Sequence, residues 1–252
     1  MELNNYNKHK TIEVCLSPAM IHLYDIRHSI VVVIDVLRAS SSMCVAFANG
    51  AERIVPVMSL DESMSYKNKG YIVGAERNGE MIEGFDLGNS PFSFSKEKVK
   101  GKSIALTTSN GTRAIQAAKT AHQVVIGSFL NLNILTDWLR AQDQNVICLC
   151  SGWKNVFNLE DTLFAGAVVN RLISEFEYSS NCDSAIAAQH LYNLSRNDMY
   201  KFLENSSHRK RLERLHIEED IKFCLTPNQA PVIPVLAGDE LVNMDVLQDV
   251  RS

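Results

Sequence analysis

The sequence has little that would suit a membrane or a nucleic acid. Its longest apolar run covers residues 30–34, whereas a helix that crosses a bilayer needs about 20 apolar residues. The formal net charge of −4 provides no basic excess for phosphate backbones or anionic lipids. Residues 1–10 contain no apolar stretch of the kind found in signal peptides. We therefore expect a cytoplasmic protein without membrane or nucleic-acid partners.

Cysteine and histidine are present, but without the spacing of a metal site or a disulfide framework. Most of the six cysteines lie in apolar stretches, which is typical of reduced, buried cysteines. Cys148 and Cys150 have no second Cys/His pair at zinc-site spacing, so the core of a strand explains them better than a metal site does. The seven histidines lack triad or metal spacing, and His22 or His28 as a general base is a weak hypothesis.

Several common nucleotide-binding and hydrolase motifs are also missing. The sequence has no Walker A loop, no Gly-x-Gly-x-x-Gly fingerprint and no Gly-x-Ser-x-Gly elbow. No cysteine is followed six residues later by arginine, and residues 35–37 lack the second acid of an Asp-x-Asp phosphohydrolase. These absences exclude the corresponding classes of enzyme.

Apolar strands alternate with helix-length segments up to residue 176. Residues 29–36 form a β-branched run typical of a strand buried on both faces, and residues 159–176 predict a long helix. We expect an α/β fold of three layers, with a mostly parallel central sheet and helices on both faces. A helical excursion follows at about 181–223, and prolines then bracket a late edge strand at 232–236. One domain would cover residues 1–252.

A polar stretch between residues 76 and 91 carries four carboxylates, one arginine and three glycines. Such long polar loops inside a compact domain are usually functional or disordered. Phe85 and Leu87 can anchor this one to the core. We predict an ordered acidic loop that could hold a metal ion.

Polar clusters follow four of the predicted strands. They comprise Asp35 with Arg38, the loop 76–91, residues 107–113 and residues 151–161. In open α/β sheets, ligands bind beyond the carboxyl ends of the strands. The sequence therefore predicts that these clusters form one site.

The cluster after the strand at 103–107 suits an anion such as phosphate, because backbone N–H groups at a helix start attract negative charge. Its residues are also preferred helix caps, so a purely structural cap is an equal alternative. The candidates for binding phosphate here are Thr108, Ser109, Asn110, Gly111 and Thr112.

The acids at the strand ends favour a hard cation. A carboxylate such as Asp35 is costly to bury unless it is paired or bound to a metal, and Arg38 could be its structural partner. Oxygen ligands without nearby His or Cys favour Mg²⁺ over zinc. Glu160 and Asp161 could instead only complement the dipole of their helix. Other acids are Glu76, Glu80, Glu83 and Asp86.

The basic side chains divide into two groups. Arg77 and Arg113 are candidate clamps for anionic oxygens, with surface salt bridges as the alternative. The basic run 208–211 is followed closely by acids, so we interpret it as a solvated helix face.

Taken together, these stretches resemble one known family, the 2-phosphosulfolactate phosphatases. The similar stretches run in family order at residues 33–40, 76–79, 83–91, 107–112, 127–131 and 159–166. The resemblance implies a Mg²⁺-dependent acid phosphatase, a phosphoric monoester hydrolase. It would convert 2-phospho-3-sulfolactate, or a related small anionic phosphoester, to the alcohol and phosphate. In methanogens this step belongs to coenzyme M biosynthesis. A non-catalytic small-anion binding or regulatory protein is the alternative, and a homo-oligomer is compatible with the sequence.

The resemblance also implies roles for individual residues. The expected catalytic residues are Asp35, Arg38, Glu76 and Arg77, and Arg38, Arg77 and Arg113 would join residues 108–112 in binding phosphate. The expected Mg²⁺ ligands are Asp35, Glu76 and Asp161, with Asp86 and Glu160 as further candidates. Metal-oriented water is favoured as the attacking group, and Asp35 as a nucleophile stays open. The chain departs from the family at residues 151–154, a turn expected to line the non-phosphate end of the substrate.

Overall fold

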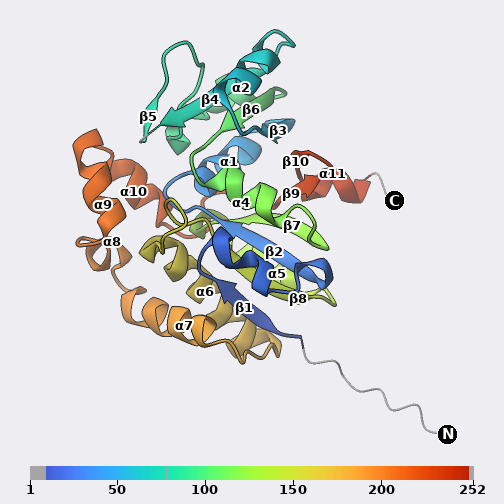
Figure 1. The fold of residues 1–252 in the computed structure, drawn as a ribbon, viewed down its shortest axis with the longest axis vertical. Coiled ribbons are helices and arrows are strands. Elements are labelled where there is room, and N and C mark those ends of the chain that lie inside the picture. The colour runs from blue at the N-terminus through green and yellow to red at the C-terminus, as the bar shows by residue number, and fades with distance from the viewer. Residues whose placement is uncertain (1–9, 78, 250–252) are drawn as a thin grey trace, which may run out of the picture.

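The computed structural model describes residues 10–77 and 79–249. Its ten strands form one sheet, in which helices cover both faces (Figure 1). Asn78, which belongs to the polar stretch 76–91, lies outside the described residues. So do residues 1–9, which entered the expectation about a signal peptide. In sheet order the strands are β1 (Ile12–Cys15), β8 (Asn145–Cys150), β2 (Ser29–Ile34), β7 (Gln123–Gly127), β9 (Pro234–Ala237), β10 (Glu240–Asn243), β3 (Arg53–Pro56), β6 (Ser103–Thr107), β4 (Ile72–Arg77) and β5 (Glu80–Met81).

The sheet consists of two parallel blocks joined by an antiparallel hairpin. Strands β1, β8, β2 and β7 form one block, and β3, β6 and β4 form the other. The hairpin β9–β10 pairs antiparallel with β7 on one side and with β3 on the other. Three consecutive antiparallel pairings separate the blocks, so the two blocks run in opposite senses along the sheet. The expected mostly parallel sheet is confirmed, with this reversal added.

Strand β2 shows why helices must cover both faces. Its alternate residues Ile30, Val32 and Ile34 pack in a core with α5, α6 and α7. Val31 and Val33 face the other way, into a core with α1 and α4. A strand with both faces buried is a continuous apolar run, as predicted for residues 29–36. The helices involved are α1 (Ala39–Ala48), α4 (Gly111–Ala118), α5 (Leu132–Arg140), α6 (Leu159–Phe176) and α7 (Asp183–Ser195).

Two expectations about secondary structure are wrong. The predicted edge strand near residue 234 is β9, which lies inside the sheet, and it tolerates Pro234 because that residue begins the strand. The opening of the predicted acidic loop is a hairpin, since Glu76 and Arg77 belong to β4 and pair with β5. Asn-Gly at 78–79 is a strong hairpin signal in sequence, and it could have revealed this turn.

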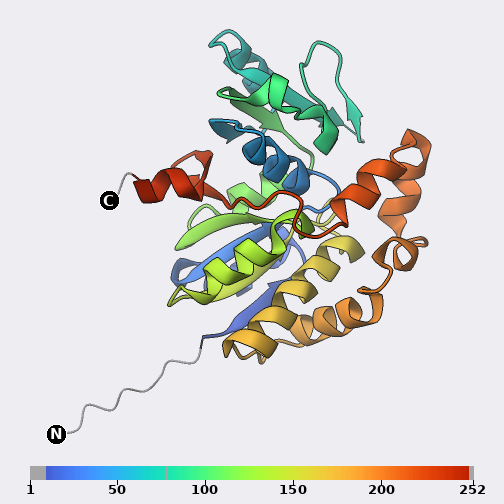
Figure 2. The ribbon, with the colours of Figure 1, turned by 180° about the vertical axis from the view of Figure 1, so that it is seen from behind.

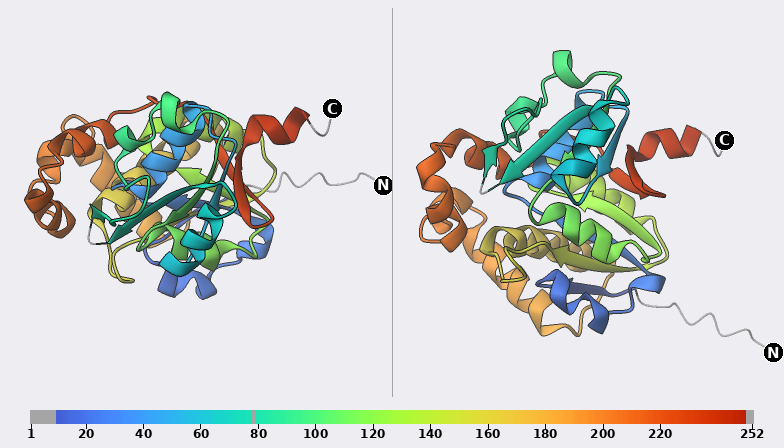
Figure 3. Two further views of the ribbon diagram at one scale, coloured as in Figure 1. Left: turned by 90° about the horizontal axis from the view of Figure 1, so that it is seen from above. Right: turned by 45° about the horizontal axis from the view of Figure 1, so that its top comes forward.

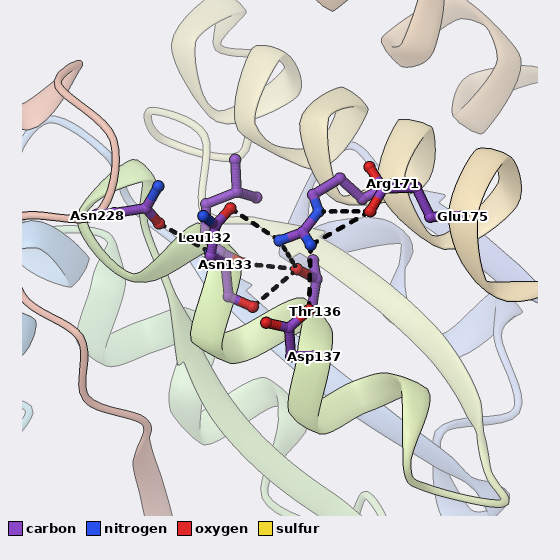
Figure 4. A network of polar contacts seen from close by, with 7 residues as sticks. All are labelled: Leu132, Asn133, Thr136, Asp137, Arg171, Glu175 and Asn228. Atoms are coloured by element: carbon purple, nitrogen blue, oxygen red, sulfur yellow. Dashed lines mark hydrogen bonds and ion pairs between the residues drawn. The ribbon is translucent and has the colours of Figure 1, made fainter.

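Helices α5 and α6 are joined by a polar network on the surface (Figure 4). Arg171 of α6 donates to Asn133 Oδ1 at 2.8 Å and to Thr136 Oγ1 at 2.6 Å, and it forms ion pairs with Asp137 and Glu175. Asn228, far along the chain, accepts the backbone N–H of Asn133 at 2.9 Å. This network orients the long helix whose first turn carries Glu160 and Asp161.

The C-terminal helices form an arc along one side of the sheet, from α7 up to β5 (Figures 1 and 2). Figure 3 shows the same arc beside β5 from two further directions. A Cβ at Gly79 would lie 2.4 Å from Leu215 Cδ1 and 3.3 Å from Leu212 Cδ2, so the arc touches the β4–β5 turn. Within the described residues no helix is long and apolar enough to cross a membrane. The arc continues through α8 (Met199–Phe202), α9 (Ser207–Leu212), η5 (Glu213–Leu215) and α10 (Glu218–Cys224), while α2 (Leu60–Lys67), α3 (Lys96–Val99) and α11 (Met244–Asp249) lie elsewhere.

Candidate active site

A pocket of about 660 Å³ lies where the carboxyl ends of both parallel blocks meet the C-terminal arc. Two sets of residues line most of it. The strand-end wall consists of Asp35, Glu76, Arg77, Thr108, Ser109, Asn110, Arg113, Trp153 and Lys154. The helical wall consists of His208, Lys210, Arg211, Leu212 and Arg214. All four polar clusters expected from the sequence contribute to the strand-end wall.

Asp35 lies at the point where β2 passes into α1. It is 9% exposed, its backbone N–H donates to Ser40 Oγ at 3.2 Å, and its carboxylate accepts weakly from Ala39 N at 3.4 Å. A Cβ at Gly111 would lie 3.0 Å from Asp35 Oδ2, so glycine lets the start of α4 approach this carboxylate. Asp35 is therefore fixed between the starts of two helices, whose dipoles favour negative charge there.

The loop after β6 uses most of its hydroxyls within the protein. Thr108 and Thr112 cap each other, with Thr112 N donating to Thr108 Oγ1 at 3.0 Å and Thr108 N donating to Thr112 Oγ1 at 3.2 Å. Ser109 donates to Glu76 Oε1 at 2.8 Å, and Asn110 Oδ1 accepts from Lys154 N at 3.2 Å. The structural cap, left open as an alternative, is thus present. Gly111 and Thr112 lie behind the lining residues, while Arg113 lines the pocket.

Arg38 is held by two partners that its sequence neighbourhood does not reveal. Its side chain is 5% exposed, and it donates to Asp220 Oδ2 at 2.5 Å and to Gly79 O at 2.6 Å. Ser90 donates to the other oxygen of Asp220 at 3.0 Å. Asp35, the partner considered from the sequence, is not the one that Arg38 binds in these contacts. Arg38 thereby joins the β4–β5 turn to α10, and it lines the pocket from this position.

Glu160 and Asp161 are buried beneath the pocket rather than exposed at a helix start. Asp161 accepts the N–H of Val36 at 2.9 Å and that of Gly152 at 3.0 Å, so it ties together the turns after β2 and β8. Glu160 Oε1 binds His208 Nδ1, while its Oε2 is buried without a partner. The two acids therefore do more than complement the helix dipole, because each fixes a distant segment.

The helical wall contradicts the interpretation of residues 208–211 as a solvated helix face. His208, Lys210 and Arg211 all line the pocket. The Arg211 guanidinium stacks on the ring of Trp153, with Cζ 4.1 Å from the ring centroid. The sequence reasoning missed these residues because a run of basic residues on a short helix is usually a surface feature. Their nearness to the predicted site arises only from the tertiary arrangement of α9.

Buried acidic side chains gather at the base of the pocket. Burial raises the pKa of Asp35 to about 6, with contributions from Glu76 and Glu160, while His208 opposes them. Burial, followed by the charges of Glu160 and Asp35, also raises the pKa of Asp161 well above its usual range. Carboxylates whose charged forms are disfavoured in this way would gain from a bound cation.

Two of the three expected Mg²⁺ ligands, Asp35 and Glu76, line the pocket, and Asp161 does not. Within residues 10–77 and 79–249, no group of three or more His, Cys, Asp or Glu side chains has a metal-binding arrangement. Asp161 already binds two backbone N–H groups, whereas Asp35 and Glu76 line the pocket. Mg²⁺ commonly binds one or two carboxylates and retains water, so this pair fits it as an open site and not as a closed cage.

Asp86 lies apart from this arrangement. Its carboxylate forms an ion pair with Lys67 at 3.0 Å and accepts Val73 N at 3.0 Å, and it is not among the pocket-lining residues. It holds the loop after β5 against β4. Arg77 and Arg113 are pocket-lining residues, as the proposed clamps require.

Comparison with known proteins identifies relatives of this chain. A family model described as 2-phosphosulpholactate phosphatase matches residues 15–239. A probable 2-phosphosulfolactate phosphatase of Caldanaerobacter subterraneus is 38% identical over 216 residues, covering 84% of this chain and 89% of the relative. Its counterpart in Thermotoga petrophila is 39% identical over 207 residues, covering 82% and 88%. One from Clostridium acetobutylicum is 32% identical over 235 residues, covering 92% and 99%.

The matched region extends from β1 to the β9–β10 turn, so it includes both walls of the pocket. The family model and these relatives are all named as phosphatases, which confirms the expected enzyme class, a phosphoric monoester hydrolase. Coverage on this scale leaves no part of the pocket outside the comparison, and the chain belongs to the 2-phosphosulfolactate phosphatase family.

Proposed function

We propose that the protein hydrolyses the phosphate ester of 2-phospho-3-sulfolactate to sulfolactate and phosphate, with Mg²⁺ as cofactor. The observation that carries this proposal is the pairing of opposite charges in one pocket. Two carboxylates, Asp35 and Glu76, share it with seven Lys and Arg side chains, which are Arg38, Arg77, Arg113, Lys154, Lys210, Arg211 and Arg214. A substrate with three anionic groups and a divalent cation would bind between these two sets, of which Arg38 is already paired with Asp220.

Phosphate binding falls to the strand-end wall. Arg113 and Arg77 line the pocket beside the loop 108–110, and their guanidinium groups can each hold two oxygens of one phosphoryl group. The start of α4 adds the partial positive charge of a helix N-terminus. These groups neutralise the dianion and orient its ester bond.

Mg²⁺, if held by Asp35 and Glu76, would supply charge neutralisation at the phosphoryl oxygens. The protein itself positions the two carboxylates. Ser109 donates to Glu76, and the α1 and α4 starts fix Asp35. In hydrolysis, water adds to phosphorus, the ester P–O bond breaks, and the departing oxygen gains a proton. His208 lies in the pocket wall with Nδ1 on Glu160, which leaves Nε2 to contact substrate oxygens.

The test is phosphate release by the purified chain from 2-phosphosulfolactate, with Mg²⁺ and with EDTA. We expect release with Mg²⁺ and its loss with EDTA. Glu83→Gln, which changes an exposed acid of the same loop outside the pocket, is the matched control and should keep full activity. Absence of release under every metal condition would contradict the proposed substrate. Release that EDTA leaves unchanged would contradict the Mg²⁺ requirement alone.

A further inference from the structure

Arg211 presents buried hydrogen-bond donors that have no acceptor. Its Nε and Nη2 atoms are buried and have no hydrogen-bond partner within residues 10–77 and 79–249. Burying a charged donor without an acceptor is costly, so such groups in a native protein need an explanation. Arg211 lines the pocket, so its guanidinium lies next to the space that a bound molecule would fill. The missing acceptors can come from a ligand of the pocket or, within the protein, from the unpaired Oε2 of Glu160.

The two unpaired donors have a specific geometry. Nε and one Nη nitrogen form one edge of the planar guanidinium, and their N–H bonds point in the same direction. This edge binds two oxygens of one oxyanion side by side, which a lysine ammonium cannot do. A carboxylate or a sulfonate has the matching pair of oxygens.

Trp153 fixes the plane in which those donors lie. The Arg211 Cζ atom is 4.1 Å from the ring centroid of Trp153, and Lys154 Nζ is 4.5 Å from the same centroid. Stacking on an indole restricts the guanidinium and leaves its edges available. Trp153 belongs to the β8–α6 turn, in which its N–H and C=O both bond with Val156 at 2.9 Å. The anchor is therefore itself held by a short, closed turn.

The charges near Arg211 offer a competing explanation. Burial lowers the pKa of Arg211, and the charge of Glu160 raises it, so the guanidinium could simply balance this acid. Glu160 binds His208 through Oε1, while its Oε2 has no hydrogen-bond partner among the described residues. Lys154 and Lys210 also line the pocket, so the surroundings hold more positive charge than Glu160 requires.

We propose that Arg211, stacked on Trp153, binds a second anionic group of the substrate, separate from the phosphate. The group is an oxyanion with two oxygens side by side, either the carboxylate or the sulfonate. This inference rests on the proposed function, because it assumes a phosphoester that carries a further anion. Arg211 then makes the enzyme specific for such phosphoesters, while the strand-end wall binds the phosphate that all phosphoesters share.

The experiment compares Arg211→Met with the wild type on three phosphoesters. They are 2-phosphosulfolactate, 2-phospholactate, which lacks the sulfonate, and the phosphate ester of 2-hydroxyethanesulfonate, which lacks the carboxylate. We expect Arg211→Met to lower kcat/KM for the complete substrate by about 10- to 100-fold, as for the loss of a charge-assisted hydrogen-bonded pair. One truncated substrate should lose as much, and the other should be unaffected. The group that the unaffected substrate lacks is the group that Arg211 binds.

Arg209→Met is the matched control. Arg209 lies on the same helix, its guanidinium stacks on Tyr200 with Cζ 3.9 Å from the ring centroid, and it does not line the pocket. Its substitution should change none of the three kcat/KM values. Arg211→Lys should fall between wild type and Arg211→Met, because it keeps the charge but loses the paired donors.

An equal loss on all three substrates would overturn the proposal, since it would mean that Arg211 balances Glu160. An unchanged kcat/KM for Arg211→Met would overturn it as well. Calorimetric binding of 3-sulfolactate to wild type and to Arg211→Met gives a readout independent of phosphate release. Weaker binding to the variant supports the second-anion role even if the wild type releases no phosphate, so failure of the proposed function is distinguishable. Unfolding midpoints of each variant establish that the compared proteins are folded.

Discussion

The two walls of the pocket differ in how their polar groups are satisfied. In the strand-end wall, Ser109 bonds Glu76 and Thr108 bonds Thr112, so the wall is assembled by its own contacts. In the helical wall, the buried donors of Arg211 lack acceptors. The loop of the first wall is therefore held by its own hydrogen bonds, whereas the second wall retains unpaired buried donors. Under the proposed function, the strand ends position the reacting groups and α9 contacts the rest of the ligand.

Asp35→Asn should have the largest effect on phosphate release, because it removes a charge from the more preorganised strand-end wall. We expect phosphate release to fall by about 10³-fold or more, as for the loss of a central electrostatic group. The fold should persist, since the amide occupies the same volume. Phosphate release and circular dichroism measured on one preparation would check this. Retained turnover would remove Asp35 from the mechanism.

Asp220→Ala tests whether α10 supports Arg38. The Arg38–Asp220 pair is buried, so truncating one partner leaves a buried charge and should lower the free energy of unfolding by about 3–5 kcal/mol. Glu52→Ala removes a partner of the exposed Arg53 and should have a much smaller effect, because solvent screens this ion pair. Denaturant titration of both variants measures the difference. Equal losses of unfolding free energy in the two variants would mean that the C-terminal arc contributes little to this part of the pocket.

The pH dependence of stability tests the charge gathered at the base of the strand-end wall. Burial and nearby acids raise the pKa of Asp35 from 3.8 to about 6. Between those values the unfolded chain has lost the proton that the folded protein keeps. The free energy of unfolding should therefore fall by about 2 kcal/mol from pH 4 to pH 6 and by about 3 kcal/mol over the whole titration, since each pKa unit is worth about 1.4 kcal/mol. Asp35→Asn should remove this contribution, which denaturant titrations at several pH values would show.

Thr108→Val should have the smallest effect on stability, and it tests whether the hydroxyls of this loop serve contacts within the loop. Its hydroxyl accepts the N–H of Thr112 at 3.0 Å, as a helix cap does. We expect a loss of about 1 kcal/mol in unfolding free energy, typical for removal of a cap. KM should change little, because this hydroxyl is used within the loop. A large rise in KM at unchanged stability would instead assign the hydroxyl to the substrate.

The sequence was informative wherever position along a strand decides where a residue lies. Alternating strands and helices placed Asp35, Glu76 and Ser109 at strand ends, and the structure brings these residues to one pocket. Their meeting does not follow from one parallel edge, because three antiparallel pairings separate the two blocks. The arrangement of β9 and β10, and hence this reversal, depends on pairing between distant segments.

The rest of the site depends on contacts that no local pattern encodes. Asp220 reaches Arg38 across 182 positions, and His208 reaches Glu160 across 48. A charged helix such as α9 shows the same sequence pattern whether it lies on an open surface or over a pocket. The single-domain organisation, the oligomeric state and the full set of Mg²⁺ ligands stay predictions.

The long span of the Arg38–Asp220 contact has a consequence for synthesis. A ribosome produces β2, with Arg38 directly after it, long before Asp220, which follows 182 residues later. Domains generally fold during synthesis as their segments emerge, and contacts of large sequence separation form late. Until α9 and α10 have been made, the nascent chain therefore carries an open, unfinished pocket. A chain that lacks α9 would keep the strand-end acids and lose the cations of the helical wall.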